Sequence, residues 1–285
     1  MVYRFLRYPE GKCKAVTFSY DDLFTYDRKL SDILTEHGLK GTFNVNSSSL
    51  GGKNHLSREE VQTWILDRGH EVAVHGEFHR ANGLVRPVEG IRDVLNCRID
   101  LEKAFDRIIR GMAYPDSGIG AIQNGGNREE IKQYLVQLDI AYARTAKSDV
   151  AGFMLPEDWY AWTPTAHHGN PELFSEIEKF LDLSVDTLYR SSRYPRLFFV
   201  WGHSFEFERN GNWDLLERIC KALGGREEIW YATNMEIYEY VSAYHSLVFS
   251  ADGERVYNPT LKKIWFDVDG KQYKIAPGET ITISN

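Results

Sequence analysis

Residues 15–22 read Ala-Val-Thr-Phe-Ser-Tyr-Asp-Asp, an apolar and β-branched run that ends abruptly in two adjacent carboxylates. Runs of this kind are typical of buried parallel strands. In an α/β barrel the loops that follow such strands build the active site at the strands' carboxyl ends. Asp21 and Asp22 would repel each other there unless a cation, such as a divalent metal ion, offsets their charge. The alternative is a helix-capping aspartate beside a solvated one.

Strand and helix patterns alternate along the chain that follows this stretch. Further strands are expected at residues 41–46, 71–75, 112–114, 140–143, 197–201 and 229–232, and helices lie between them, including a long one over residues 87–110. Seven strands alternating with helices predict a parallel α/β barrel. From residue 247 onward, short alternating runs with two Asp-Gly turn signals predict a small antiparallel β appendage. We expect the barrel over residues 1–245 and the appendage over residues 246–285.

Composition excludes several classes of protein. The net charge of −7 and the lack of any basic block argue against nucleic-acid binding. The N-terminus has no apolar core long enough for a signal peptide, and no run is long enough to span a membrane. Three widely spaced cysteines, Cys13, Cys97 and Cys220, are typical of reduced thiols. A cytoplasmic location is therefore expected, while the oligomeric state is not predicted.

Histidines stand at the ends of two other predicted strands. His75 ends the third strand, His79 follows it by four residues, and His203 comes directly after the sixth strand. One carboxylate and two neutral imidazoles leave open positions on a zinc-like ion, which is the catalytic pattern. The other aspartate can take a proton from water, and a histidine across the site can protonate a leaving group. These residues predict metal-assisted hydrolysis of an amide or ester; two unrelated loop histidines are the alternative.

Three segments of the sequence resemble the polysaccharide deacetylases of carbohydrate esterase family 4, the NodB-homology domain. Residues 17–22, Thr-Phe-Ser-Tyr-Asp-Asp, are similar to the family's first motif, Thr-Phe-Asp-Asp-Gly, with two residues inserted. Residues 69–79 resemble the second motif, His-(Ser/Thr)-x-x-His with its Gly-His-Glu lead-in, and this match is the most specific. Residues 198–203 resemble the last motif, an apolar strand that ends in a histidine.

The resemblance extends over residues 14–240 and implies a distorted seven-stranded barrel, in line with the strand count. It also implies roles for the site residues: Asp21 as the catalytic base, His203 as the acid, and Asp22, His75 and His79 as metal ligands. Zinc is the expected ion because imidazole and carboxylate ligands suit it, although cobalt, nickel or iron could occupy such a site.

The sequence departs from the family pattern at several positions. The third motif, Arg-Pro-Pro-Tyr, is present only as residues 113–116, Ala-Tyr-Pro-Asp, so the arginine that would orient the base is missing. We hypothesise that Arg144, just past the fifth strand, replaces it; a surface ion-pair arginine is the alternative. Leu23 stands where the first motif has glycine. The fourth motif, in which the family pairs Asp with Trp, is matched only by Asp158-Trp159.

Substrate contacts are expected from polar and aromatic residues near the strand ends: Tyr114, Asp116, Trp159, Trp201 and His168. The tryptophans could stack on a sugar, although large aromatic residues are also ordinary packing residues. Asp116 adds a carboxylate at the presumed substrate end, which argues against the family's usual polysaccharide substrate.

The resemblance and the residues together predict a metal-dependent deacetylase that acts on an N-acetylated, or less favourably an O-acetylated, sugar. The expected partner is a soluble oligosaccharide or sugar conjugate. One alternative keeps the fold and metal but hydrolyses a cyclic amide or imide, as in allantoinase-like relatives. Another is a catalytically inactive carbohydrate-binding or scaffold protein, against which the complete set of base, ligands and acid argues.

Overall fold

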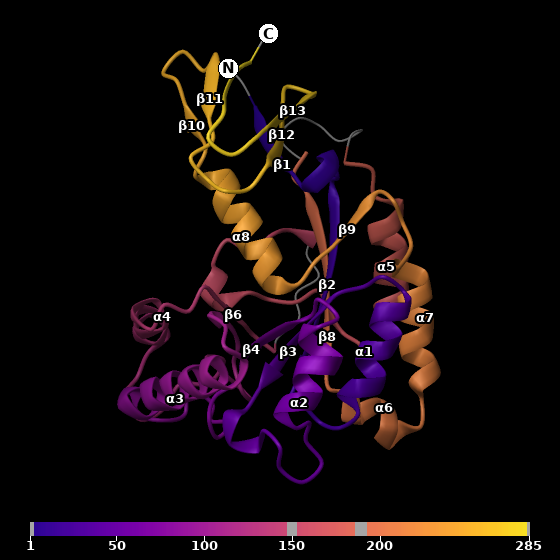
Figure 1. The fold of residues 1–285 in the computed structure, drawn as a ribbon, viewed down its shortest axis with the longest axis vertical. Coiled ribbons are helices and arrows are strands. Elements are labelled where there is room, and N and C mark those ends of the chain that lie inside the picture. The colour runs from indigo at the N-terminus through magenta and orange to yellow at the C-terminus, as the bar shows by residue number, and fades with distance from the viewer. Residues whose placement is uncertain (1–2, 147–152, 186–192, 284–285) are drawn as a thin grey trace.

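The fold is built around one curled sheet of parallel strands with β2 at its centre (Figure 1). The computed structural model describes residues 3–146, 153–185 and 193–283. Every residue of β2 is buried, as expected for a strand that is covered on both faces. The strands of this sheet are β2 (Lys14–Asp21), β3 (Gly41–Val45), β4 (Glu71–Val74), β5 (Gly111–Ala113), β6 (Tyr142–Arg144), β7 (Ala166–His167), β8 (Arg196–Gly202) and β9 (Ile229–Tyr231).

The strand order β6-β5-β4-β3-β2-β8-β7 brings the sheet round into a ring. Arg144 at the end of β6 forms a parallel bridge with Trp162, which precedes β7. The Trp162 N–H donates to the Ala143 carbonyl at 3.0 Å, and the Thr145 N–H donates to the Trp162 carbonyl at 2.9 Å. The expected distorted α/β barrel is confirmed.

Two strands of the barrel sheet differ from the sequence-based expectation. β7 was not predicted, because two residues carry no hydrophobic period. β9 was predicted, but it does not close the ring: it pairs with the first half of β2, and β3 pairs with the second half along the same edge. β7, together with the segment that begins at Trp162, therefore takes the place that residues 229–232 were expected to fill.

Helices cover the outer face of the barrel (Figure 1). They are α1 (Asp27–Glu36), α2 (Arg58–Val61), α3 (Pro87–Phe105), α4 (Arg128–Gln137), α5 (Leu173–Asp182), α6 (Ser204–Asn210), α7 (Trp213–Leu223) and α8 (Asn234–His245). The prediction that the third of these runs to residue 110 was wrong. Asp106 takes a left-handed conformation with φ 50° and ends α3, and the Glu102 carboxylate then accepts the Ile109 N–H at 3.0 Å. None of the described helices is both long and apolar enough to cross a membrane.

The C-terminal residues form two small antiparallel sheets, which lie beyond α8 at the amino end of the barrel strands (Figure 1). The N-terminal strand β1 joins one of them by pairing with β12, and a buried ion pair between Arg7 and Asp267, 3.9 Å apart, links the same two strands. The strands are β1 (Arg4–Arg7), β10 (Val248–Phe249), β11 (Arg255–Tyr257), β12 (Ile264–Val268), β13 (Lys271–Ile275) and β14 (Thr280–Thr282). The domain boundary between residues 245 and 246 stays a prediction.

Candidate metal centre and active site

The two aspartates face one site because the chain leaves β2 through left-handed backbone. Asp22 has a φ of 79° and Leu23 a φ of 58°. Consecutive side chains of an extended strand point to opposite faces, and this turn breaks that alternation. His203 Nε2 consequently lies 3.9 Å from an Asp21 oxygen and 4.0 Å from an Asp22 oxygen. Leu23 thus adopts a glycine-like conformation where the family motif has glycine, and such strain, about 1–3 kcal/mol per residue, is concentrated at functional sites.

Asp22, His75 and His79 bring three potential ligand atoms together. These atoms all lie within 4.8 Å of one another, and Asp22 Oδ1 is 3.6 Å from Nε2 of each histidine. The His75 Nδ1–H donates to the Ala113 carbonyl at 2.9 Å, so the lone pair of Nε2 points toward Asp22. Burial also lowers the pKa of His75, which favours the neutral, ligating form. The predicted ligand set therefore fits a divalent ion.

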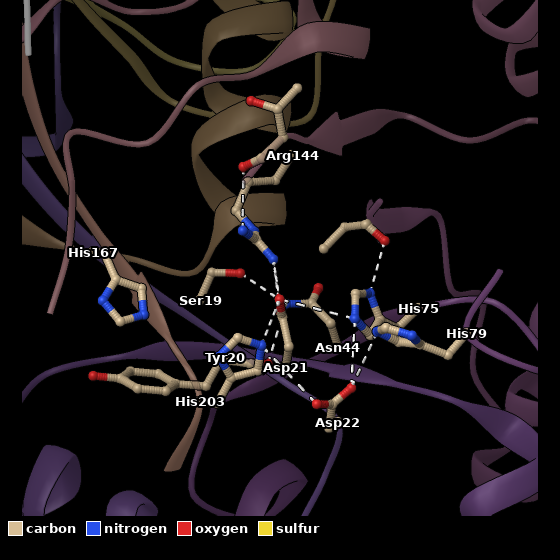
Figure 2. A network of polar contacts seen from close by, with 12 residues as sticks. Ser19, Tyr20, Asp21, Asp22, Asn44, His75, His79, Arg144, His167 and His203 are labelled. Atoms are coloured by element: carbon tan, nitrogen blue, oxygen red, sulfur yellow. Dashed lines mark hydrogen bonds and ion pairs between the residues drawn. The ribbon is translucent and has the colours of Figure 1, made fainter. Parts of the chain in front are cut away.

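Arg144, the last residue of β6, contacts Asp21, the last residue of β2. Its Nη2 lies 2.6 Å from Asp21 Oδ1 and 2.5 Å from Oδ2, and Asn44 Nδ2 donates to Oδ1 at 2.8 Å (Figure 2). Burial alone would raise the pKa of Asp21, but the charges of Arg144, His75 and His203 hold that pKa below its usual value. Asp21 is therefore ionised at neutral pH and held in one orientation.

The position of Arg144 explains how the missing motif arginine can be replaced. β5 and β6 pair in register, with Ala113 opposite Arg144. Ala113 occupies the position of the family's third-motif arginine. The guanidinium therefore comes from the adjacent strand at the same height in the barrel, and the Trp201 ring lies 4.7 Å from its central carbon.

His203 stands on one side of the two aspartates, with His75 and His79 on the other (Figure 2). Its Nδ1 lies 3.4 Å from Glu206 Oε1 in the first turn of α6. Burial alone would lower the pKa of His203, but its contact with Glu206 and the charges of both aspartates raise that pKa above its usual value. The imidazolium form of His203 is consequently stabilised at this position.

Glu206 gathers two further histidines, and these residues form a hydrogen-bonded cluster. His167 Nε2 and His168 Nε2 lie 3.0 and 2.9 Å from Glu206 Oε2. The Gly169 N–H donates to His167 Nδ1 at 3.1 Å, so the ring proton of neutral His167 lies on Nε2 and is donated to Glu206. His167, His203 and Glu206 form a second group whose spacing would suit a metal ion.

A cavity of about 290 Å³ opens over these groups. Three of the predicted substrate contacts, Tyr114, Asp116 and Trp201, lie in its lining, and Ala146 completes it. The other lining residues are the proposed base, acid and metal ligands: Asp21, Asp22, His75, His79 and His203. The other two predicted contacts are not in that lining. Trp159 packs edge-on against Trp162 and Tyr238, and His168 is buried and stacked on Phe207. All five assignments to the substrate remain predictions.

The fourth-motif candidate lies away from the acid. Asp158 Oδ2 pairs with Lys132 Nζ at 2.6 Å, on α4. Glu206 is the carboxylate next to His203 Nδ1. From its position in the sequence, three residues after the histidine, Glu206 could equally have been a solvated residue. Asn44 was not predicted as a site residue. Its sequence signal was a polar side chain near the end of a buried strand, and the structure pairs it with Asp21 at the end of β2.

Residues 8–139 match the sequence model of the family described as polysaccharide deacetylase. The resemblance to polysaccharide deacetylases is confirmed. The matched range contains Asp21, Asp22, His75 and His79, while Arg144 and His203 lie beyond it. The match extends over less than half of the chain, and similarity to this family favours a hydrolase. No curated protein sequence matches the chain.

Solved structures share the fold at low sequence identity. A putative polysaccharide deacetylase from Mycobacterium smegmatis is 17% identical with a TM-score of 0.55, over 84% of this chain and 94% of its own. A probable polysaccharide deacetylase from Pseudomonas aeruginosa PAO1 is 12% identical with a TM-score of 0.58, over 81% and 92%. Puue allantoinase is 12% identical with a TM-score of 0.59, over 84% and 93%. At these identities the similarity concerns the fold alone.

Proposed function

We propose that this protein is a metal-dependent hydrolase that removes the acetyl group from an N-acetylated sugar. The observation that carries the proposal is the arrangement of an ionised carboxylate, Asp21, and an imidazole, His203, around the same three potential metal ligands. All these groups line a single cavity. A protein that only bound sugars would not need a base, a ligand set and an acid at one place.

Asp22, His75 and His79 would hold the ion, and zinc is our choice for it. When bound, the ion would lower the pKa of a water molecule and polarise the acyl oxygen. Asp21 would accept a proton at one of its carboxylate oxygens, with Arg144 and Asn44 holding those oxygens in place. His203 Nε2 would donate a proton to the leaving nitrogen. Each of these proton transfers contributes roughly 10²- to 10⁴-fold in rate.

The support that Glu206 gives to His203 favours an amide over an ester. An amine leaves as a neutral molecule only after its nitrogen is protonated, whereas an alcohol is a better leaving group and depends less on an acid. Glu206 lies 3.4 Å from His203 Nδ1, and the three surrounding imidazoles hold the pKa of Glu206 well below its usual range, although burial opposes this. An ionised partner of this kind stabilises the proton-donating form of His203.

Acetate release from N-acetylated chitooligosaccharides tests the proposal. Purified protein supplied with zinc should release acetate, and Asp21→Asn and His203→Ala should each lower kcat by at least about 10²-fold. Elemental analysis should find one ion per chain, which is lost in His75→Ala. Hydrolysis of a cyclic amide without acetate release would overturn the deacetylase assignment in favour of an imidase. Sugar binding without any turnover would overturn it in favour of an inactive binding protein.

A further inference from the structure

The loop that carries two of the proposed metal ligands departs from the family motif at its second position. It reads His-Gly-Glu-Phe-His over residues 75–79, and Gly76 stands where the motif has serine or threonine. Gly76 has a φ of 78° and His79 a φ of 55°, so the backbone is left-handed at both positions. A glycine has no side chain that could fix the loop, and it loses more conformational freedom on folding than any other residue. Another part of the chain is therefore needed to hold the loop in one conformation.

Asp93 on α3 occupies the space that a side chain at position 76 would need. A Cβ atom on Gly76 would clash with Asp93 Oδ2 and would lie 3.3 Å from Asp93 Cγ. The next nearest atom, Pro115 Cγ, would be 3.5 Å away, which is an ordinary contact. Asp93 is only 3% exposed, so its carboxylate is packed against the loop. The glycine of the loop and the aspartate of the helix thus fit each other.

Asp93 also binds the backbone of the loop. Its Oδ1 accepts the Phe78 N–H at 2.9 Å, and its main-chain carbonyl accepts the Glu77 N–H at 3.0 Å. Hydrogen bonds to a buried carboxylate are stronger than those between neutral groups. Asp93 therefore holds the two residues that come directly before His79.

The two histidines depend on this loop to different degrees. His75 is buried directly after β4, and its ring donates a hydrogen bond to the Ala113 carbonyl, which orients it. The His79 side chain is 42% exposed, and its Nε2 lies 3.6 Å from Asp22 Oδ1. The position of the His79 ring is consequently determined more by the backbone that carries it than by packing around it.

We propose that Asp93 is a positioning residue for the metal centre, and that its carboxylate takes the place of the motif's serine or threonine side chain. By accepting the Phe78 N–H, Asp93 fixes the loop in the conformation that turns His79 toward Asp22 before any metal binds. This inference deepens the proposed function and rests on its metal site. If Asp93 only stabilised the fold, its replacement would lower the Tm without weakening metal binding by the protein that stays folded.

The zinc affinity of the folded protein, measured by competition with a chelator of known affinity, tests this role. Asp93→Ala should raise the Kd for zinc about tenfold to a hundredfold, the usual loss when a residue that orients a metal ligand is removed. Asp93→Asn keeps a side-chain oxygen for the Phe78 N–H and should retain most of the affinity. Asp100→Ala is the matched control, because Asp100 also lies on α3 and accepts a hydrogen bond from Ser47 in a neighbouring loop. This control should leave the Kd unchanged. An unchanged Kd in Asp93→Ala, or a rise of the same size in Asp100→Ala, would overturn the proposal.

Hydrogen exchange in the metal-free wild type is a second measurement, and it does not depend on whether a variant folds. The Phe78 and Glu77 amides should be protected from exchange, because both are bonded to Asp93 without any metal. Exchange of both amides at the rate of an unfolded chain would overturn the proposal. Failure of the proposed function gives a different result, since the wild type would then release no acetate or bind no zinc. In either case, protection of the Phe78 amide still decides whether Asp93 holds the loop.

Discussion

Arg144 and Asp21 form a buried ion pair, and we expect a double-mutant cycle to detect strong coupling between them. Their side chains are 0% and 4% exposed, with 2.5 Å between Arg144 Nη2 and Asp21 Oδ2. Arg144→Met leaves a buried carboxylate without its guanidinium, and Asp21→Asn leaves a buried guanidinium without its carboxylate. Removal of one partner of a buried pair costs about 3–5 kcal/mol, whereas removal of both charges can be nearly neutral. The two single losses together are about 6–10 kcal/mol, so the double variant should be more stable than their sum by at least about 3 kcal/mol.

Urea unfolding of the four proteins at pH 7, followed by circular dichroism, measures this coupling. Arg144→Met combined with Asp267→Asn, on β12 in the appendage, is the matched control and should be additive within about 0.5 kcal/mol. The same additivity for Arg144→Met and Asp21→Asn would refute the coupling. Acetate release adds a functional readout, because Asp21 without Arg144 loses its orientation and its pKa rises. Full activity of Arg144→Met would mean that Arg144 does not orient the base.

Three further predictions concern protonation and metal binding. Glu206→Gln removes the carboxylate that raises the pKa of His203, so kcat should fall about tenfold to a hundredfold and the basic limb of the pH profile should move to lower pH; an unchanged profile would contradict this. Burial raises the pKa of Glu71, at the amino end of β4, to about 7, above its value in the unfolded chain. The free energy of unfolding therefore falls as the pH rises from the unfolded pKa to the folded one. Between pH 5 and 8 the wild type should lose about 2.5 kcal/mol more than Glu71→Gln in urea unfolding, and parallel curves would disprove the assignment. Chelation of divalent ions should lower the Tm of the wild type but not that of His75→Ala; equal shifts would exclude the ligand set.

The sequence predicted the parts of the fold that long hydrophobic runs determine. β2, β4 and β8 each combine a buried apolar run with a polar residue at or after its end, so the edge that carries Asp21, His75 and His203 could be inferred before their contacts were known. β7 was missed because a two-residue strand is determined by its neighbours, β8 and the Trp162 bridge, and not by its own pattern.

The contacts around the acid were harder to predict than the acid itself. Glu206 reaches His203 because α6 begins immediately after β8, which places residue 206 in the first turn of the helix. His167 and His168 reach the same carboxylate from the end of β7, the strand paired with β8, and this depends on tertiary packing. Sequence spacing indicated the first relation at most and contained no signal for the second.

Arg144 lies opposite the position at which the family motif has its arginine. We propose that Arg144 on β6 takes the place of the motif arginine on β5, because the two positions are in register and the Arg144 guanidinium contacts both Asp21 oxygens. The sequence motif includes only the position on β5, so the absence of an arginine there suggests a defective site. The paired register places Arg144 opposite Ala113, and from there its guanidinium contacts Asp21. A missing motif residue therefore argues against function only when the residue opposite it on the adjacent strand cannot supply the same group.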